Sequence, residues 1–171
     1  QMSPDKKLSH EMIINAPKEK VWQVLQSKVV FGASNDFFFS HGVSYPLSMQ
    51  LKTSNGINVL HCDYNNGVTD AQILQLTQGE MFRFKLNDSL VSMKEKSIYQ
   101  DPQTMHVKNY FAVNYGEFNI KKLNASQSIL IATTSYKHKF KPESYADFWV
   151  QLFVNRLHQH VLTKIKTKAE S

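Results

Sequence analysis

The stretch Pro142–Glu170 reads PESYADFWVQLFVNRLHQHVLTKIKTKAE and predicts one long C-terminal helix. Pro142 can occupy the first turn, where its missing N–H costs no hydrogen bond, and no Pro or Gly follows it. Apolar residues three and four positions apart predict one broad stripe: Phe148, Trp149, Leu152, Phe153, Leu157, Val161 and Ile165. A helix about 40 Å long with such a face requires a large apolar partner surface.

Short apolar runs separated by turn residues precede this helix, and they predict that the partner is an antiparallel sheet. Asn55-Gly56 and Asn66-Gly67 are strong signals for two-residue hairpins. The predicted strands span residues 8–15, 47–53, 57–64, 68–77, 81–86, 105–123 and 128–140, with a long loop at 87–102. A sheet of about seven strands must curl, so we expect the long helix to cover its concave face.

Two short helices are expected after the first strand. Pro17 is placed to begin the first, with Asn15 as a candidate cap and an apolar face that includes Val21 and Trp22. The second, within residues 31–42, would begin at Asp36, although a packed connector fits this segment equally well. The fold class is therefore α+β, in a single domain over residues 1–171 with residues 1–7 as a disordered tail.

Composition excludes several classes of function. The single cysteine, Cys62, rules out an internal disulfide and thiolate zinc sites, and it suits a cytoplasmic chain. The net charge of +6 is dispersed, and the aromatic residues lie in apolar strands, so no nucleic-acid partner is expected. Lysines near both ends make contact with an anionic membrane surface the better expectation. No apolar run approaches the length of about 20 residues that spans a bilayer.

No catalytic motif is present, and we expect no catalytic residue, metal or cofactor. The sequence contains neither a glycine-rich phosphate loop nor a Gly-x-Ser-x-Gly elbow. His158 and His160 lie two apart on a helix, too far round it to share a metal. His61 and Asp63 share a strand face but have no third ligand, and Cys62 is expected to be an inert buried residue.

Aromatic side chains with a few polar groups are typical of pockets for small molecules. Seven aromatic residues are candidates to line a cavity between sheet and helix: Tyr45, Tyr64, Phe82, Phe84, Tyr110, Trp149 and Phe153. Phe82 and Phe84 are chosen because Arg83 and Lys85 alternate with them. Arg156 and His158 are candidate polar anchors. The alternative for each tyrosine is that it simply packs against its neighbours. The alternative for Arg156 and His158 is a position at the edge of the apolar stripe.

The opening Ile13-Ile14-Asn15-Ala16-Pro17-Lys18-Glu19-Lys20-Val21-Trp22-Gln23-Val24-Leu25 resembles the first strand and helix of the SRPBCC superfamily, also called START-like or Bet v 1-like. Further segments look like one bacterial branch of it: Gly42–Leu47, Cys62, Gly67, Gly116–Phe118, Thr133–Tyr136, Trp149–His158, Val161–Leu162 and Ile165–Glu170. This resemblance implies a helix-grip fold, a curved sheet around a C-terminal helix. In that branch a membrane-embedded part often precedes the domain, which implies tethering to a membrane in a longer protein.

The resemblance leaves the function open, because the superfamily includes lipid carriers, hormone binders and polyketide cyclases. One departure concerns Asn155, which stands where a histidine one turn before His158 is expected, so a role for a histidine pair along this helix is in doubt. We expect a noncatalytic domain that binds a hydrophobic small molecule or lipid. The alternatives are an enzyme of the cyclase or dehydratase type, and a membrane-proximal sensor or interaction module with a filled core.

Overall fold

The computed structural model describes residues 1–34, 36, 45–65, 67–86 and 111–171. Most of the predicted second helix, the loop at 87–102, the start of the strand predicted at 105–123, and Asn66 and Tyr110 lie outside these residues.

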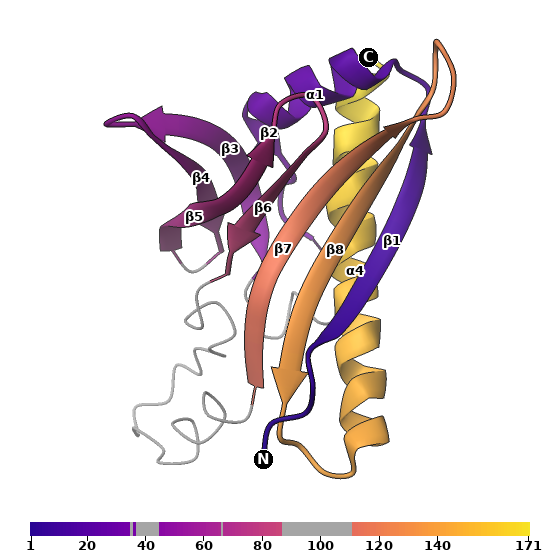
Figure 1. Ribbon diagram of the computed structural model, residues 1–171. Helices are drawn as coiled ribbons and strands as arrows, with labels where there is room; N and C mark the ends of the chain where they lie inside the picture. Colours follow the sequence, from indigo (N-terminus) through magenta and orange to yellow (C-terminus); the bar gives the residue numbers. More distant parts are fainter. Residues whose placement is uncertain (35, 37–44, 66, 87–110) are drawn as a thin grey trace.

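A curled antiparallel sheet forms most of the molecule (Figure 1). Its eight strands lie in the spatial order β1-β8-β7-β6-β5-β4-β3-β2. Their bounds are Lys6–Ile14 (β1), Val29–Val30 (β2), Pro46–Ser54 (β3), Ile57–Tyr64 (β4), Gly67–Thr77 (β5), Met81–Lys85 (β6), Phe111–Lys122 (β7) and Ser128–His138 (β8). The fold class is the predicted one, and the additional strand is the two-residue β2.

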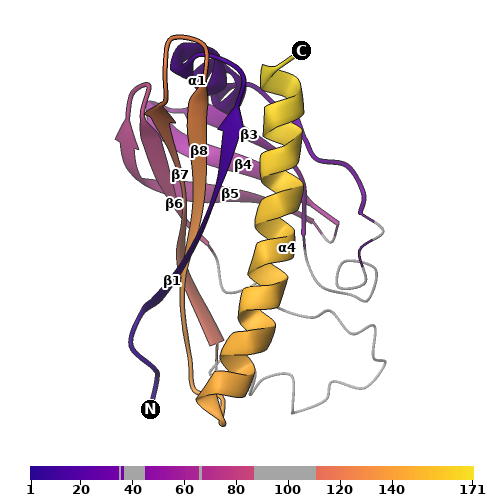
Figure 2. The ribbon, with the colours of Figure 1, turned by 90° about the vertical axis from the view of Figure 1, so that its right-hand side faces the viewer.

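Helix α4 (Glu143–Ala169) runs along the concave side of the sheet, beside β1 and β8 (Figure 2). Its C-terminal half reaches the shorter helix α1 (Lys18–Gln26), which closes the upper end in Figure 1. Pro17 and Pro142 stand immediately before these helices, as predicted. Asn15 does not cap α1, because its side chain accepts a hydrogen bond from Gln127. No helix of the described residues is long and apolar enough to cross a membrane.

Turn chemistry sets the register of the first hairpin. Asn55 and Gly56 both have positive φ, at 51° and 76°, which is the conformation of a type I′ turn. Ser54 consequently pairs with Ile57, and the register of β3 and β4 continues to Ser48 and Asp63. Further along the sheet, a bulge between Val113 and Tyr115 interrupts the pairing of β7 with β8, close to the bend expected near Gly116.

The core lies where α1 and the C-terminal half of α4 meet the sheet. Val161, Leu162, Ile165 and Ala169 of α4 are buried there, against residues such as Leu25 of α1. The first turns of α4 differ from the prediction, because Phe148 and Trp149 are exposed. The buried face passes instead through Val154 and His158. Apolar residues occur almost all round the helix between positions 145 and 154, so their spacing alone could not identify the buried side.

Candidate functional site

Polar side chains join the first half of α4 to the inner face of the neighbouring strands. The Asp147 cluster consists of Lys6 on β1, Tyr136 and His138 on β8, and Asp147 on α4. Lys6 Nζ donates to Asp147 Oδ2, and His138 Nε2 lies 2.8 Å from Asp147 Oδ1. Tyr136 donates to the same Oδ1 over 3.4 Å. Lys6 also donates to Glu143, at 2.6 Å, so this one lysine binds two carboxylates of the helix.

The hydrogen bonds of the cluster fix its protonation. The backbone N–H of Phe140 donates to His138 Nδ1, so the proton of this ring lies on Nε2 and faces Asp147. Burial acts to raise the pKa of Asp147, but the hydrogen bonds from Lys6 and His138 outweigh burial and hold that pKa below its ordinary value. The same hydrogen bond, with that to Glu143, raises the pKa of Lys6. Asp147 is therefore an ion-paired carboxylate and not a proton donor.

A second polar group, the histidine pair, lies further along α4. His158 is 5% exposed, its Nδ1 lies 2.7 Å from Nδ1 of His10 on β1, and its Nε2 lies 2.8 Å from the hydroxyl of Thr134 on β8. Burial, and secondarily the neighbouring His10, lower the pKa of His158 to about 3. Burial also lowers the pKa of His10. The two Nδ1 atoms can share one proton only while at least one ring is neutral. The lowered pKa values of both histidines favour the neutral form and therefore agree with this hydrogen bond.

Sequence reasoning missed most of these residues. It named His158 but not His10, Lys6, Tyr136, His138 or Asp147. The alternation of β1 and β8 indicates that these side chains face inward. Lys6 and His10 share the even-numbered positions of β1 with the buried Ile14. Tyr136 and His138 share those of β8 with the buried Leu130. The histidine partner of His158 comes from β1 and not from the preceding helical turn, where Asn155 stands.

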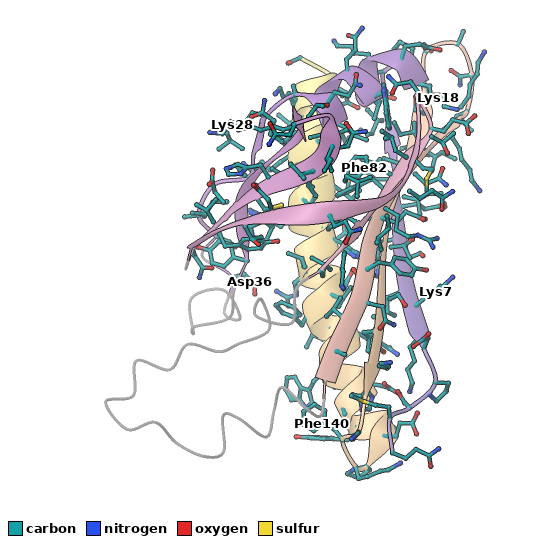
Figure 3. All side chains as sticks on the ribbon, turned by 60° about the vertical axis from the view of Figure 1, so that its left-hand side comes forward. Lys7, Lys18, Lys28, Asp36, Phe82 and Phe140 are labelled. Atoms are coloured by element: carbon teal, nitrogen blue, oxygen red, sulfur yellow. The ribbon has the colours of Figure 1, made fainter. Side chains whose placement is uncertain are left out.

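Three aromatic candidates on the described strands, Phe82, Phe84 and Tyr64, belong to the core or pack against it. Phe82 is fully buried (Figure 3), and its ring centroid lies 5.6 Å from that of Phe118 and 6.0 Å from that of Phe84. Arg83 lies on the convex face, paired with Glu117 at 2.9 Å, so the even-numbered residues of β6 point inward as predicted. Tyr45 is buried and Tyr64 is half-buried, with its pKa raised by burial.

The candidates on α4 are spread round the helix. Phe153 is half-buried and His158 is buried, whereas Trp149 is exposed and contacts Tyr145 and Phe148. Arg156 is exposed and pairs with Asp36 at 2.6 Å, beside the middle of the helix (Figure 3). The structure therefore brings Phe82 and Phe84 together, and it separates both from Trp149 and Arg156.

Seven partly buried apolar side chains pack against the core from the concave face. Five of them, which we call the inner margin, come from four adjacent strands and the helix: Leu51, Tyr64, Ile73, Phe84 and Leu157. Cys62 is buried beside them, and burial raises the pKa of its thiol to about 12, which makes it the inert residue expected. The side chains of the inner margin are apolar apart from the hydroxyl of Tyr64.

An open pocket of about 330 Å³ lies on another side of α4. Its lining is polar and consists of Ser34, Asp36, Arg156, Gln159, His160, Thr163 and Lys164. No three His, Cys, Asp or Glu side chains among the described residues are grouped as metal ligands. His61 instead pairs with Asp70 at 2.6 Å and lies 3.6 Å from Asp63.

No protein-family model and no curated protein sequence matches the chain. Solved structures do match it, over nearly the whole length of both chains. A Zhui aromatase/cyclase from a Streptomyces species is 14% identical, with 98% of this chain and 94% of that chain covered and a TM-score of 0.54. A Thalictrum flavum norcoclaurine synthase point mutant, in complex with a transition-state analogue, is 9% identical, with 97% and 94% covered and a TM-score of 0.54.

An uncharacterised protein from Bacillus thuringiensis is 12% identical, with 97% of this chain and 100% of that chain covered and a TM-score of 0.57. Identities this low establish the fold and not the activity. Together with the curled sheet and the long C-terminal helix, these likenesses show that the chain has a helix-grip fold, as the resemblance in its sequence implies.

Proposed function

We propose that this domain binds a hydrophobic small molecule or lipid on the concave face of its sheet, between the inner margin and α4. The observation that carries this proposal is the inner margin itself. Its five side chains pack on one side against the cluster of buried residues and remain partly exposed on the other. Apolar surface on a concave face is what a hydrophobic ligand buries when it binds.

The packing of α4 supports the same position. The C-terminal half of the helix is held by fully buried residues such as Leu162 and Ile165. The first half is held at one side, through the Asp147 cluster and the histidine pair, to β1 and β8. Leu157 and Phe153 lie on the flank that turns away from these polar contacts, so they are the helix residues we assign to the ligand.

A noncatalytic role agrees better with the polar groups than a cyclase or dehydratase. An enzyme of that type requires at least two polar groups that converge on the ligand. The Asp147 cluster and the histidine pair are engaged in hydrogen bonds within themselves, and the shifted pKa values reflect those contacts and burial. The likeness in fold to an aromatase/cyclase supports the capacity of this architecture for a ligand, without assigning its chemistry.

A fluorescent apolar probe, N-phenyl-1-naphthylamine, tests the position of the ligand. Ile73 and Leu74 are neighbours on β5: Ile73 belongs to the inner margin, and Leu74 is 47% exposed. We expect saturable binding of one probe to the wild-type domain, weakened about tenfold by Ile73→Ser because one aliphatic side chain leaves the contact. Leu74→Ser is the matched control and should leave the affinity unchanged. Equal affinities for all three proteins, each verified as folded by circular dichroism, would place the probe elsewhere and contradict the proposal.

A further inference from the structure

Three aromatic side chains form an exposed cluster on the first turns of α4. Tyr145, Phe148 and Trp149 are 63%, 59% and 45% exposed. Their rings contact one another edge to face, with centroids 6.3 Å apart for Tyr145 and Trp149 and 5.5 Å apart for Phe148 and Trp149. Large aromatic side chains gathered at the surface mark a site of interaction more often than isolated ones do.

The cluster lies on the side of α4 that faces away from the sheet. The buried face of the helix passes through Val154 and Ile165, and Asp147, which binds Lys6, shares that face. At 100° per residue, Tyr145 and Trp149 lie on the opposite side of the helix from Val154. No other described helix or strand covers this outer side (Figure 2).

The charge of the helix identifies the partner. From Phe148 to Ala169 the sequence of α4 contains no Asp or Glu, and it contains four bases: Arg156, Lys164, Lys166 and Lys168. The acids of the first turns, Glu143 and Asp147, are paired with Lys6 on the inner side. Lys141, just before the helix, lies 3.9 Å from Glu143, and its side chain is 77% exposed. Arg156 pairs with Asp36, Lys166 pairs with Glu170, and Lys168 donates to Ser27 and to the carbonyl of Lys28. The outer face is therefore aromatic at one end, and further along Arg156 and Lys164 together outweigh the single charge of Asp36.

This combination fits the surface of a bilayer that contains anionic lipid. Trp and Tyr rings are amphipathic and prefer the level of the headgroups, while each basic residue near such a surface is attracted to the lipid phosphates. A helix with these two features lies in the plane of the interface. We propose that the outer face of α4 docks on an anionic bilayer, with Tyr145, Phe148 and Trp149 among the headgroups and Lys141, Arg156 and Lys164 opposite the phosphates. This inference does not depend on the proposed ligand.

Co-sedimentation with vesicles tests the docking. The probes are vesicles of phosphatidylcholine alone and vesicles with about a third of phosphatidylglycerol. We expect the wild-type domain to bind the anionic vesicles, to bind the neutral ones weakly, and to dissociate at high salt. Phe148→Ser/Trp149→Ser should weaken binding at least tenfold. The matched control is Ile57→Ser/Val68→Ser, which removes two residues of similar exposure from the far hairpins and should leave binding unchanged.

A second pair of variants separates local charge from net charge. Lys141→Gln/Lys164→Gln should weaken binding about tenfold or more, because each lysine contributes a factor of about five. Lys121→Gln/Lys122→Gln has the same net charge but alters the distant β7–β8 hairpin, and it should have a smaller effect. Equal losses from both pairs would show a nonspecific response to net charge and would overturn the proposal.

Tryptophan fluorescence can show directly whether the aromatic cluster inserts into the bilayer. Trp22 is buried and Trp149 is exposed. On anionic vesicles with brominated lipids, we expect quenching of the wild-type fluorescence and almost none in Trp149→Phe, which retains an aromatic ring and should still sediment. Three results would overturn the proposal: unquenched wild-type fluorescence, equal binding to neutral vesicles, or undiminished sedimentation of the Phe148→Ser/Trp149→Ser variant. A dimer formed through the aromatic cluster, with no vesicle binding, would identify a second copy as the occupant and would also overturn it.

Discussion

Gly116 on β7 leaves the space that the Phe84 ring occupies on the neighbouring strand. A Cβ atom at this position would lie 2.5 Å from Cζ of Phe84, well inside van der Waals contact. Phe84 is at the same time part of the inner margin and of the ring stack with Phe82 and Phe118. The absence of a side chain at Gly116 thus determines where the aromatic floor of the concave face lies.

Gly116→Ala should lower the free energy of unfolding by about 1–3 kcal/mol, because the added methyl group forces the ring out of its place. Urea denaturation measures this change. Phe84→Leu removes the ring edge, so Gly116→Ala should lower the free energy of unfolding by a smaller amount in a Phe84→Leu background. An equal cost in both backgrounds would show that the ring is not the source of the effect.

The histidine pair makes stability depend on pH in a defined window. His158 has a pKa of about 3 in the folded protein and an ordinary value of about 6.5 when unfolded. Because the folded pKa is the lower one, the unfolded chain binds more protons between these values. The contribution of His158 is complete above pH 6.5 and is lost as the pH falls toward 3. The slope from this residue alone is about 1.4 kcal/mol per pH unit.

His158→Gln should therefore reduce the slope of unfolding free energy against pH between 4.5 and 6.5 by about one proton. The reason is that the unfolded chain protonates His158 in this window, whereas the folded chain keeps it neutral. Urea denaturation at several pH values measures the slope. Asp147→Asn is the control, since its carboxylate titrates below the window. An unchanged slope in His158→Gln would show that His158 is not held neutral by the fold.

At the scale of elements, α4 is attached to the sheet in two different ways. Its C-terminal half is held by apolar burial, with Leu162 and Ile165 fully buried. Its first turns are held by the Asp147 cluster, in which one carboxylate receives hydrogen bonds from three side chains of β1 and β8. These first turns also carry the exposed aromatic cluster, so the polar contacts position the surface proposed to dock.

Asp147→Ala should destabilise the domain by about 1–3 kcal/mol, because Lys6 and His138 lose their shared acceptor. The loss should be local: amide exchange in residues 143–150 should accelerate more than exchange in residues 158–169. Hydrogen exchange followed by mass spectrometry measures both segments. Glu19→Ala on the exposed face of α1 is the control and should change neither. Uniform acceleration along α4 would contradict a separate attachment of its first turns.

The sequence predicted those elements whose signals are local. Asn55-Gly56 specified its hairpin through two residues, and the uninterrupted run after Pro142 specified a long helix. The polar contacts depend on non-local pairing, because His10 and His158 are 148 residues apart and meet only when β1 pairs with β8 beside α4. The prediction that Phe148 and Trp149 belong to the buried stripe is wrong, because periodicity records the angular position of a residue but not which side of the helix is covered.

At the scale of the whole molecule, the domain has two surfaces with different properties. The concave face carries the partly exposed inner margin, and the outer face of α4 carries the aromatic cluster and basic residues. The helix lies between them, with its polar contacts to β1 and β8 on the buried side. The two proposals, a hydrophobic ligand on the concave face and a lipid surface at the outer face of α4, concern different surfaces and are separately testable.

Native mass spectrometry of the purified domain, followed by organic extraction, tests the central claim that the concave face holds a hydrophobic ligand. We predict a mass above that of the chain alone in the native spectrum, lost on denaturation, or a one-to-one complex with an added fatty acid, sterol or aromatic polyketide. Ile73→Ser should reduce this complex, and Leu74→Ser should not. A domain that carries no ligand and forms no complex with any of these molecules would contradict the claim and would indicate a filled core.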